Sequence, residues 1–137
     1  FWPYLMQALW DRPIGYGYDA FFRSEEGAKY LSYYVVQAGG WTPYHSHNSF
    51  LQVALDGGFV GLGAFLFVIF AALWRSMVYL ARGMNKATAW PLAVIIYLMV
   101  GSMTETYFIQ FNTVEWVVLV AAVLYPLRDK ITTAKRG

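Results

Sequence analysis

Three long apolar stretches limit most strongly how this chain can fold. They cover 18, 18 and 22 residues, and the only charged residue within them is Glu115; the stretches are Gly57–Trp74, Ala87–Thr104 and Thr106–Leu127. A helix needs about 20 apolar residues to cross a hydrocarbon core of about 30 Å, and backbone groups in lipid must be satisfied within their own segment. We therefore expect three transmembrane helices, at about residues 58–80, 87–104 and 107–127, with Pro126 helping to end the third.

The composition also indicates an integral membrane protein of the all-α class. The chain is 58% hydrophobic and 13% charged, whereas soluble domains are about 45–50% apolar and about 25% charged. It contains no cysteine, which excludes a disulfide or a thiolate site. It begins at Phe1 without a signal-peptide pattern, and we expect it to be a C-terminal fragment of a larger polytopic protein.

Basic residues gather on one side of the expected helices. Seven of the ten Lys and Arg residues lie in the connector 75–86 or the tail 128–137, whereas residues 1–57 hold five acids and three bases. Lys and Arg accumulate on the cytoplasmic side of membrane proteins. Residues 1–57 and the link 105–112 are therefore predicted to face outward, and residues 128–137 to form a cytoplasmic basic tail. This topology accounts for the net charge of +2, so no nucleic-acid partner is expected.

The outward segment 1–57 is too rich in aromatic residues to be disordered. Pro3–Trp10 is predicted to form a helix that ends at Arg12, the residue before Pro13. Glu26–Gln37 is predicted to form a second short helix, and Trp41–His47 an extended approach to the membrane. The segment is therefore predicted to be an ordered loop with short helices.

A polar cluster stands where the chain enters the first apolar stretch. Ser49 and Gln52 form a capping-box pattern that predicts a helix over Phe50–Leu55, broken by Asp56–Gly58. His47 would lie just before this helix, whose positive dipole end disfavours an imidazolium. A neutral imidazole is a suitable general base near pH 7.

Simpler roles remain open for these residues. His47 and His45 can be loop residues that only shape the turn, and Asn48 can hold the loop or orient His47. The two histidines can also bind a metal with Asp19 or Asp56, but two histidines without cysteine argue against zinc, so we expect no metal and no cofactor.

Two further features outside the polar cluster need an interpretation. Gly58 and Gly61 are small residues that let a helix start close to a neighbour. Glu105, an acid at the outer end of an apolar stretch, is a candidate functional residue.

The spacing of the histidine and the glycines adds a family resemblance. His47-Asn48, nine residues and then Gly58-Phe59-Val60-Gly61 give the pattern H-N-x9-G-x-x-G. This pattern resembles the outer loop of the O-antigen ligase and O-antigen polymerase superfamily, which includes exopolysaccharide polymerases. The upstream segment Arg12–Phe21, with its proline, two glycines and phenylalanine, is also similar to that family.

The resemblance implies a membrane glycan transferase. Such an enzyme moves a glycan from an undecaprenyl-pyrophosphate lipid to an acceptor hydroxyl, on a glycan or on lipid A-core, at the outer face of the bacterial inner membrane. His47 would activate the hydroxyl, and Arg12 or Arg23 would bind the pyrophosphate, since a guanidinium suits phosphate. His45 and Asn48 would contact substrate. Three helices cannot enclose a site for so large a donor, so this fragment alone is expected to be inactive.

Two hypotheses from other functional classes stay open. One is a transporter fragment whose outer loop is a lid, although the apolar stretches contain few polar residues for a transport path. The other is a scaffold whose aromatic outer face binds proteins; it predicts that His47→Ala leaves glycan transfer intact. The sequence does not separate ligase from polymerase, which differ in their acceptor.

Overall fold

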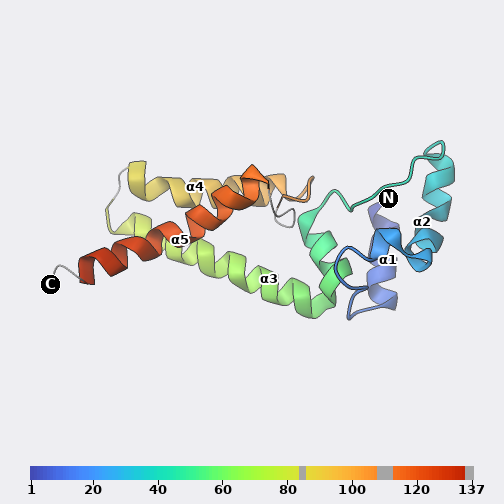
Figure 1. The fold of residues 1–137 in the computed structure, drawn as a ribbon, viewed down its shortest axis with the longest axis horizontal. Helices are drawn as coiled ribbons and strands as arrows, with labels where there is room; N and C mark the ends of the chain where they lie inside the picture. The colour runs from blue at the N-terminus through green and yellow to red at the C-terminus, as the bar shows by residue number, and fades with distance from the viewer. Residues whose placement is uncertain (84–85, 108–112, 135–137) are drawn as a thin grey trace. The chain divides into compact units, whose positions relative to one another are not determined.

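The structure is a computed structural model that describes residues 1–83, 86–107 and 113–134, and within these ranges it contains helices and no strand (Figure 1). The elements in chain order are α1 (Trp2–Asp11), the 3-10 helix η1 (Phe21–Arg23), α2 (Glu25–Gln37), α3 (Ser49–Ala81), α4 (Lys86–Gly101) and α5 (Val114–Ala134). The all-α prediction is confirmed. The chain divides into two compact units, one made of Phe1–Phe65 with Met103–Thr106 and the other of Leu66–Ser102 with Tyr107–Gly137.

The short helices of the first unit begin and end where local chemistry places them. Helix α1 has Pro3 in its first turn, where a missing N–H removes no helical hydrogen bond. Helix α2 is capped by Ser24, whose hydroxyl oxygen accepts the Gly27 N–H at 2.9 Å. Both helices agree closely with the ranges that the sequence predicts.

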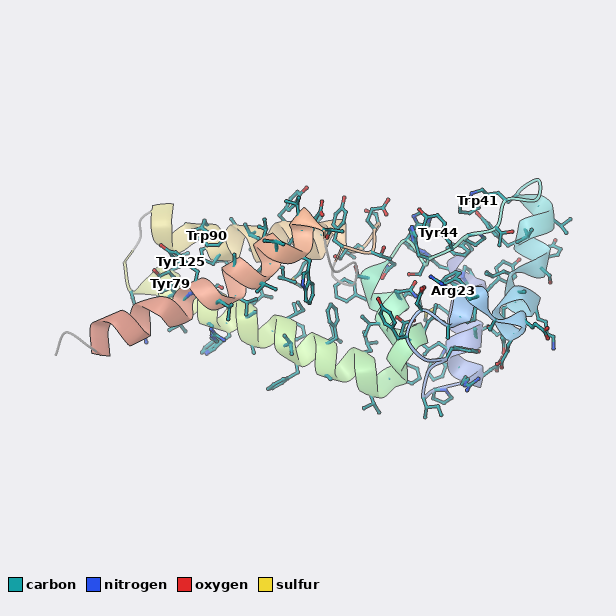
Figure 2. All side chains as sticks on the ribbon, viewed as in Figure 1. Arg23, Trp41, Tyr44, Tyr79, Trp90 and Tyr125 are labelled. Carbon is teal, nitrogen blue, oxygen red and sulfur yellow. The ribbon has the colours of Figure 1, made fainter. Side chains whose placement is uncertain are left out.

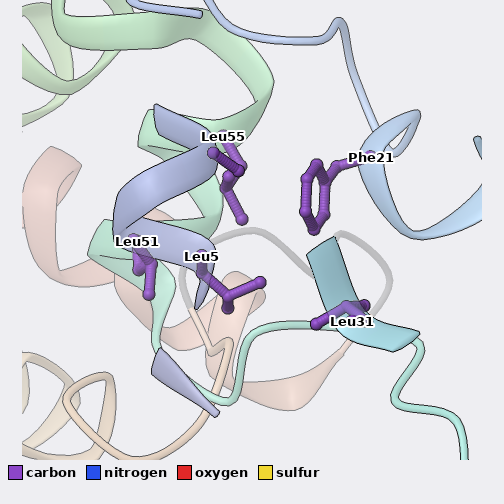
Figure 3. Close-up of a cluster of buried hydrophobic side chains, with 6 residues drawn as sticks. Leu5, Phe21, Leu31, Leu51 and Leu55 are labelled. Atoms are coloured by element: carbon purple, nitrogen blue, oxygen red, sulfur yellow. The ribbon is translucent and has the colours of Figure 1, made fainter. Parts of the chain in front are cut away.

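A buried cluster joins four elements of the first unit (Figure 3). Its largest members are at most 8% exposed: Leu5 of α1, Phe21 of η1, Leu31 of α2, and Leu51 and Leu55 of α3. Burying each such side chain contributes about 1.5–3 kcal/mol. The segment before α3 is therefore a packed body built around the first turns of α3.

The loop after α1 is fastened to α3 along the backbone. Three hydrogen bonds join them: Tyr16 N–H to the Leu55 carbonyl at 2.7 Å, Gly17 N–H to the Asp56 carbonyl at 2.9 Å, and Phe59 N–H to the Pro13 carbonyl at 2.9 Å. These bonds use carbonyl and amide groups that a kink in α3 releases from the helical pattern.

The kink is at Gly58, which interrupts the helical backbone with φ 67° and ψ −164°. A Cβ on Gly58 would overlap the Pro13 carbonyl oxygen, and a Cβ on Gly15, with φ 81°, would lie 2.5 Å from the Gly58 nitrogen. The two glycines thus allow a direct backbone contact. The predicted break near Asp56–Gly58 is present, as a kink between two helical segments.

Helix α3 carries the strongest membrane signal. Within the described ranges it is the one helix long and apolar enough to cross a membrane, with a mean hydropathy of 2.1 over its apolar window. The other two expected spans correspond to shorter apolar helical stretches, Ala89–Gly101 and Val114–Pro126. Membrane crossing by α4 and α5 therefore stays a prediction.

The prediction that Pro126 helps to end the third helix is wrong. Helix α5 continues through Pro126 to Ala134 and so includes the first part of the expected tail. A proline inside a helix removes one N–H and bends the axis, but the turns beyond it can still form. The third span is expected to start at about residue 107; the structure describes α5 from Val114, and residues 108–112 and 135–137 lie outside the described residues.

In the second unit, aromatic residues of three helices meet (Figure 2). Tyr125 of α5 lies edge-on to Tyr79 of α3 at 5.9 Å and to Trp90 of α4 at 5.1 Å. The Arg75 guanidinium donates to the Val123 carbonyl at 3.1 Å. In this unit α4 and α5 pack against each other, and Tyr79 and Arg75 link α3 to α5.

Candidate functional site

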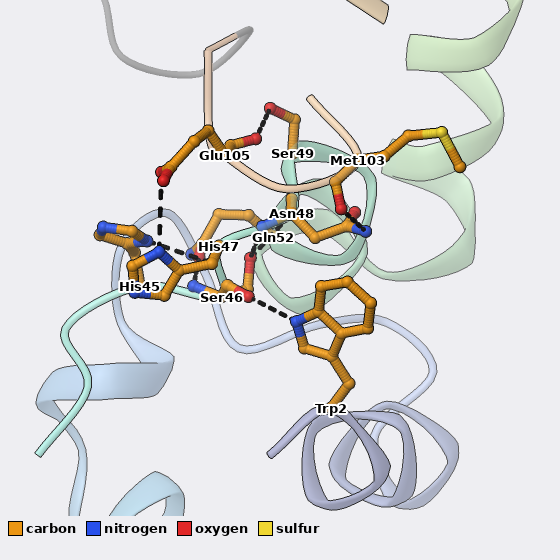
Figure 4. Close-up of polar contacts among 9 residues, drawn as sticks. All are labelled: Trp2, His45, Ser46, His47, Asn48, Ser49, Gln52, Met103 and Glu105. Carbon is orange, nitrogen blue, oxygen red and sulfur yellow. Dashed lines mark hydrogen bonds and ion pairs between the residues drawn. The ribbon is translucent and has the colours of Figure 1, made fainter. Parts of the chain in front are cut away.

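The loop before α3 is held by hydrogen bonds around Ser46 (Figure 4). Ser46 is fully buried. Its N–H donates to the Gln52 side chain at 3.0 Å, its hydroxyl donates to the Asn48 carbonyl at 2.7 Å, and its carbonyl accepts the Trp2 indole N–H at 2.8 Å. The position of the next residue, His47, is therefore fixed by the fold on both sides.

The residue that caps α3 is Asn48, and the predicted capping box of Ser49 and Gln52 is wrong. The Asn48 side-chain oxygen accepts the Leu51 N–H at 3.0 Å, an arrangement in which asparagine is as effective as serine. Ser49 is instead the first residue of α3, and its hydroxyl donates to the Glu105 carbonyl at 3.1 Å. Of the roles considered for Asn48, the structure supports the one of holding the loop.

His47 has a left-handed backbone conformation, with φ 51°. Non-glycine residues adopt it rarely, at a cost of about 1–3 kcal/mol, and such residues cluster at functional sites. The His47 N–H donates to Nδ1 of His45 at 3.1 Å, and the two ring centroids are 3.9 Å apart. His45 thus helps to hold His47 in this conformation.

The ring of His45 is suited to accept that bond. Burial lowers the pKa of His45, and the neighbouring His47 lowers it further, against a smaller opposing effect of Glu105. A neutral imidazole has one nitrogen that accepts and one that donates. With Nδ1 accepting, the proton of His45 is on Nε2.

The carboxylate of Glu105 faces the ring of His47. Its Oε2 lies 3.6 Å from His47 Nδ1, and both side chains are partly exposed. The segment that carries Glu105 belongs to the same compact unit and is anchored by the Asn48 amide, which donates to the Met103 carbonyl at 3.1 Å. A carboxylate beside Nδ1 favours the tautomer with its proton there, leaving the lone pair of Nε2 free. The sequence marks Glu105 as a candidate but does not pair it with His47.

The same three side chains satisfy the distance requirement for a metal site. One donor atom from each of His45, His47 and Glu105 lies within 4.8 Å of the others. However, His45 already uses Nδ1 to accept the His47 N–H, and its other nitrogen carries the proton. If His45 bound a metal, the hydrogen bond from the His47 N–H to its Nδ1 would be lost. This favours a site that works without a metal.

Asp56, one of the two acids considered from the sequence as metal ligands, the other being Asp19, makes its hydrogen bonds elsewhere. Asp56 Oδ1 accepts from the Gln52 amide at 3.1 Å and from the Asp19 N–H at 3.3 Å. Burial raises the pKa of Asp56 to about 6. These contacts join the kink of α3 to the loop before η1, and the described residues show no contact between Asp56 and either histidine.

Each candidate arginine is paired with an acid. Arg12 lies 3.1 Å from the Glu26 carboxylate and over the ring of Tyr16, and Arg23 pairs with Asp19. Both arginines are exposed. Since no contact among the described residues joins either one to His47, the structure does not choose between them.

An apolar groove of about 330 Å³ lies between α1 and the first part of α3. It is lined by Trp2, Met6, Leu9, Asn48, Phe50, Leu51, Ala54, Phe59 and Leu62. Its lining runs from the residue next to His47 to the turns after the kink, and its apolar character suits a hydrocarbon chain.

Comparison with known protein families gives a match over part of the chain. The family model described as O-antigen ligase matches residues 1–66. No curated protein and no solved structure matches the chain. The matched residues include both histidines, the Arg12–Phe21 segment and both glycines of the motif, so residues 1–66 of this chain are similar to the O-antigen ligase family.

Proposed function

We propose that this chain carries the acceptor-activating part of a membrane glycan transferase of the ligase or polymerase type. The observation that carries this proposal is the His47–Glu105 pair, 3.6 Å apart, at the start of the apolar helix α3. The family match to O-antigen ligase supports glycosyl transfer as the general reaction. The substrates would be a glycan on undecaprenyl pyrophosphate and a glycan or lipid A-core hydroxyl, at the outer face of a bacterial inner membrane.

In the proposed reaction, the acceptor hydroxyl oxygen attacks the anomeric carbon of the donor sugar. Nε2 of His47 takes the hydroxyl proton as the new carbon–oxygen bond forms. The bond between the anomeric carbon and the phosphate oxygen breaks, and undecaprenyl pyrophosphate leaves with the electron pair. His47 then releases its proton to water, which restores the site.

Glu105 and His45 would support His47 in different ways. The Glu105 carboxylate would orient the ring through Nδ1 and stabilise the imidazolium formed on proton transfer, as the acid does in other histidine–carboxylate pairs. His45 would act as a positioning residue through the His47 backbone N–H. Neither role needs a metal or a cofactor.

The leaving group would be bound by Arg12 or Arg23, whose guanidinium groups can exchange a carboxylate partner for pyrophosphate. The apolar groove between α1 and α3 would suit part of the lipid chain. The second and third expected spans, α4 and α5, would complete a three-helix membrane part.

The proposal is tested with His47→Ala in the intact membrane protein, reconstituted with lipid-linked glycan and acceptor. We expect the transfer rate to fall about 10²–10⁴-fold, the usual contribution of a general base, with an unchanged amount of protein in the membrane. Tyr33→Ala is the matched control, because Tyr33 is 61% exposed on α2 and packs on Tyr4. If the His47→Ala protein transferred glycan at the wild-type rate, His47 would not be the base and a scaffold role would be favoured.

A further inference from the structure

An exposed tryptophan stands beside the proposed base. The side chain of Trp41 is 46% exposed, and its ring centroid lies 6.3 Å from that of His47 at an interplanar angle of 36°. Tyr34 of α2 packs edge-on against the indole at 6.4 Å. Trp41 is thus held in place by the fold while part of its surface stays open to a ligand.

A second exposed aromatic residue borders the same pair of histidines. Tyr44 is 70% exposed, and its ring meets His45 edge-on at 4.3 Å. Figure 2 labels Trp41 and Tyr44 on the segment between α2 and α3. Exposing two large aromatic rings to water is unfavourable, and open aromatic surface beside polar groups is typical of binding sites.

We propose that Trp41 forms the floor of a subsite for the acceptor sugar, with Tyr44 at its edge. This inference rests on the proposed glycan transfer, because it places the acceptor next to His47. The ligand class is a pyranose ring, which has a face of C–H groups to lie on the indole and hydroxyls around its rim. Neither a hydrocarbon chain nor a phosphate combines these two properties.

The distances accommodate such a ring. Carbon atoms in contact lie about 3.5–4.0 Å apart, so a sugar stacked on Trp41 occupies the space above the indole. The His47 ring, centred 6.3 Å from the indole, is close enough to meet the rim of a sugar bound there. A rim hydroxyl can reach Nε2 of His47 at the roughly 2.6–3.2 Å that proton transfer needs.

The kinetic test compares Trp41→Ala, Trp41→Phe and Tyr33→Ala in the intact protein. For Trp41→Ala we expect the KM for the acceptor to rise about tenfold or more, by analogy with the loss of an aromatic stacking partner for a nucleobase. The kcat and the KM for the lipid-linked donor should stay unchanged. Trp41→Phe keeps an aromatic face and should recover part of the loss, and Tyr33→Ala should have no effect.

A binding measurement separates this inference from the proposed chemistry. Saturation-transfer NMR with a soluble acceptor oligosaccharide is carried out on His47→Ala protein, with and without Trp41→Ala. We expect sugar signals that disappear with the second substitution, whether or not His47 proves to be the base. The subsite is wrong if Trp41→Ala leaves both the acceptor KM and the NMR signal unchanged, or if it lowers only kcat. An indole covered by another part of the intact protein would give the first of these results.

Discussion

The contact between Gly58 and the loop after α1 makes a specific prediction for Gly58→Ala. The backbone of Gly58, with φ 67° and ψ −164°, lies in a region that only glycine adopts readily, at a cost of about 1–3 kcal/mol for another residue. The added Cβ would also overlap the Pro13 carbonyl oxygen, and such overpacking costs about 1–3 kcal/mol more. We expect Gly58→Ala to lower the free energy of unfolding by about 2–6 kcal/mol.

Gly61→Ala is the matched control, because the second motif glycine lacks these constraints. A Cβ on Gly61 would lie 3.6 Å from the Val53 carbonyl oxygen, an ordinary contact, and its φ is negative. An alanine there should be neutral or stabilising by at most about 1 kcal/mol. The assay is detergent-induced or thermal unfolding of the purified intact protein, with glycan transfer measured in parallel. Equal stability of the two variants would refute the argument that the Gly58 backbone and its contact with Pro13 require glycine.

Three further predictions concern the polar groups of the first unit. Glu105→Gln should slow glycan transfer about tenfold at unchanged protein level, because it removes a partial stabilisation of the imidazolium worth on the order of 1.4 kcal/mol; a wild-type rate would exclude this role. His45→Asn should keep most activity, since its side-chain oxygen can replace Nδ1 as acceptor for the His47 N–H, whereas His45→Ala should lose kcat with little change in KM; equal losses would contradict the positioning role. Because burial raises the pKa of Asp56 to about 6 from 3.8, the folded state binds this proton more tightly than the unfolded state. Stability should therefore fall as pH rises from about 4 to about 6 and level off above. In unfolding curves measured across this range, Asp56→Asn should remove that component of the pH dependence, and an unchanged slope would show that Asp56 is not its source.

The parts of the fold that the sequence predicts well depend on local signals. Pro3 and the Arg12-Pro13 pair delimit α1, and a run of apolar residues without charge identifies α3 as a helix long and apolar enough to cross a membrane. These features act over a few residues, so their effect can be read without knowing the tertiary contacts. The similarity of residues 1–66 to the O-antigen ligase family is predictable for a related reason, because the histidine and the glycines lie close together in sequence.

The features that the sequence does not predict depend on a choice between competing residues or on contacts between residues far apart in the chain. Asn48 and Ser49 are both good N-caps, and the choice of Asn48 is made by Ser49 contacting the Glu105 carbonyl, 56 residues away. Pairing Glu105 with His47 likewise requires the packing of one compact unit. Pro126 is misjudged because a proline that can end an isolated helix can also be accommodated within one that is packed.

The spacing of the family pattern acquires a physical meaning from the kink. Asn48 begins α3 and Gly58 bends it, so the residues between them form a helical segment that rises about 15 Å at 1.5 Å per residue. One end of this segment fixes the His47 loop, and the other is fastened to the Pro13–Gly17 loop through the backbone. Inserting or deleting one residue in this segment would turn His47 by about 100° relative to that loop. The spacing between histidine and glycine therefore sets both the height of the ring above the kink and the direction in which it faces.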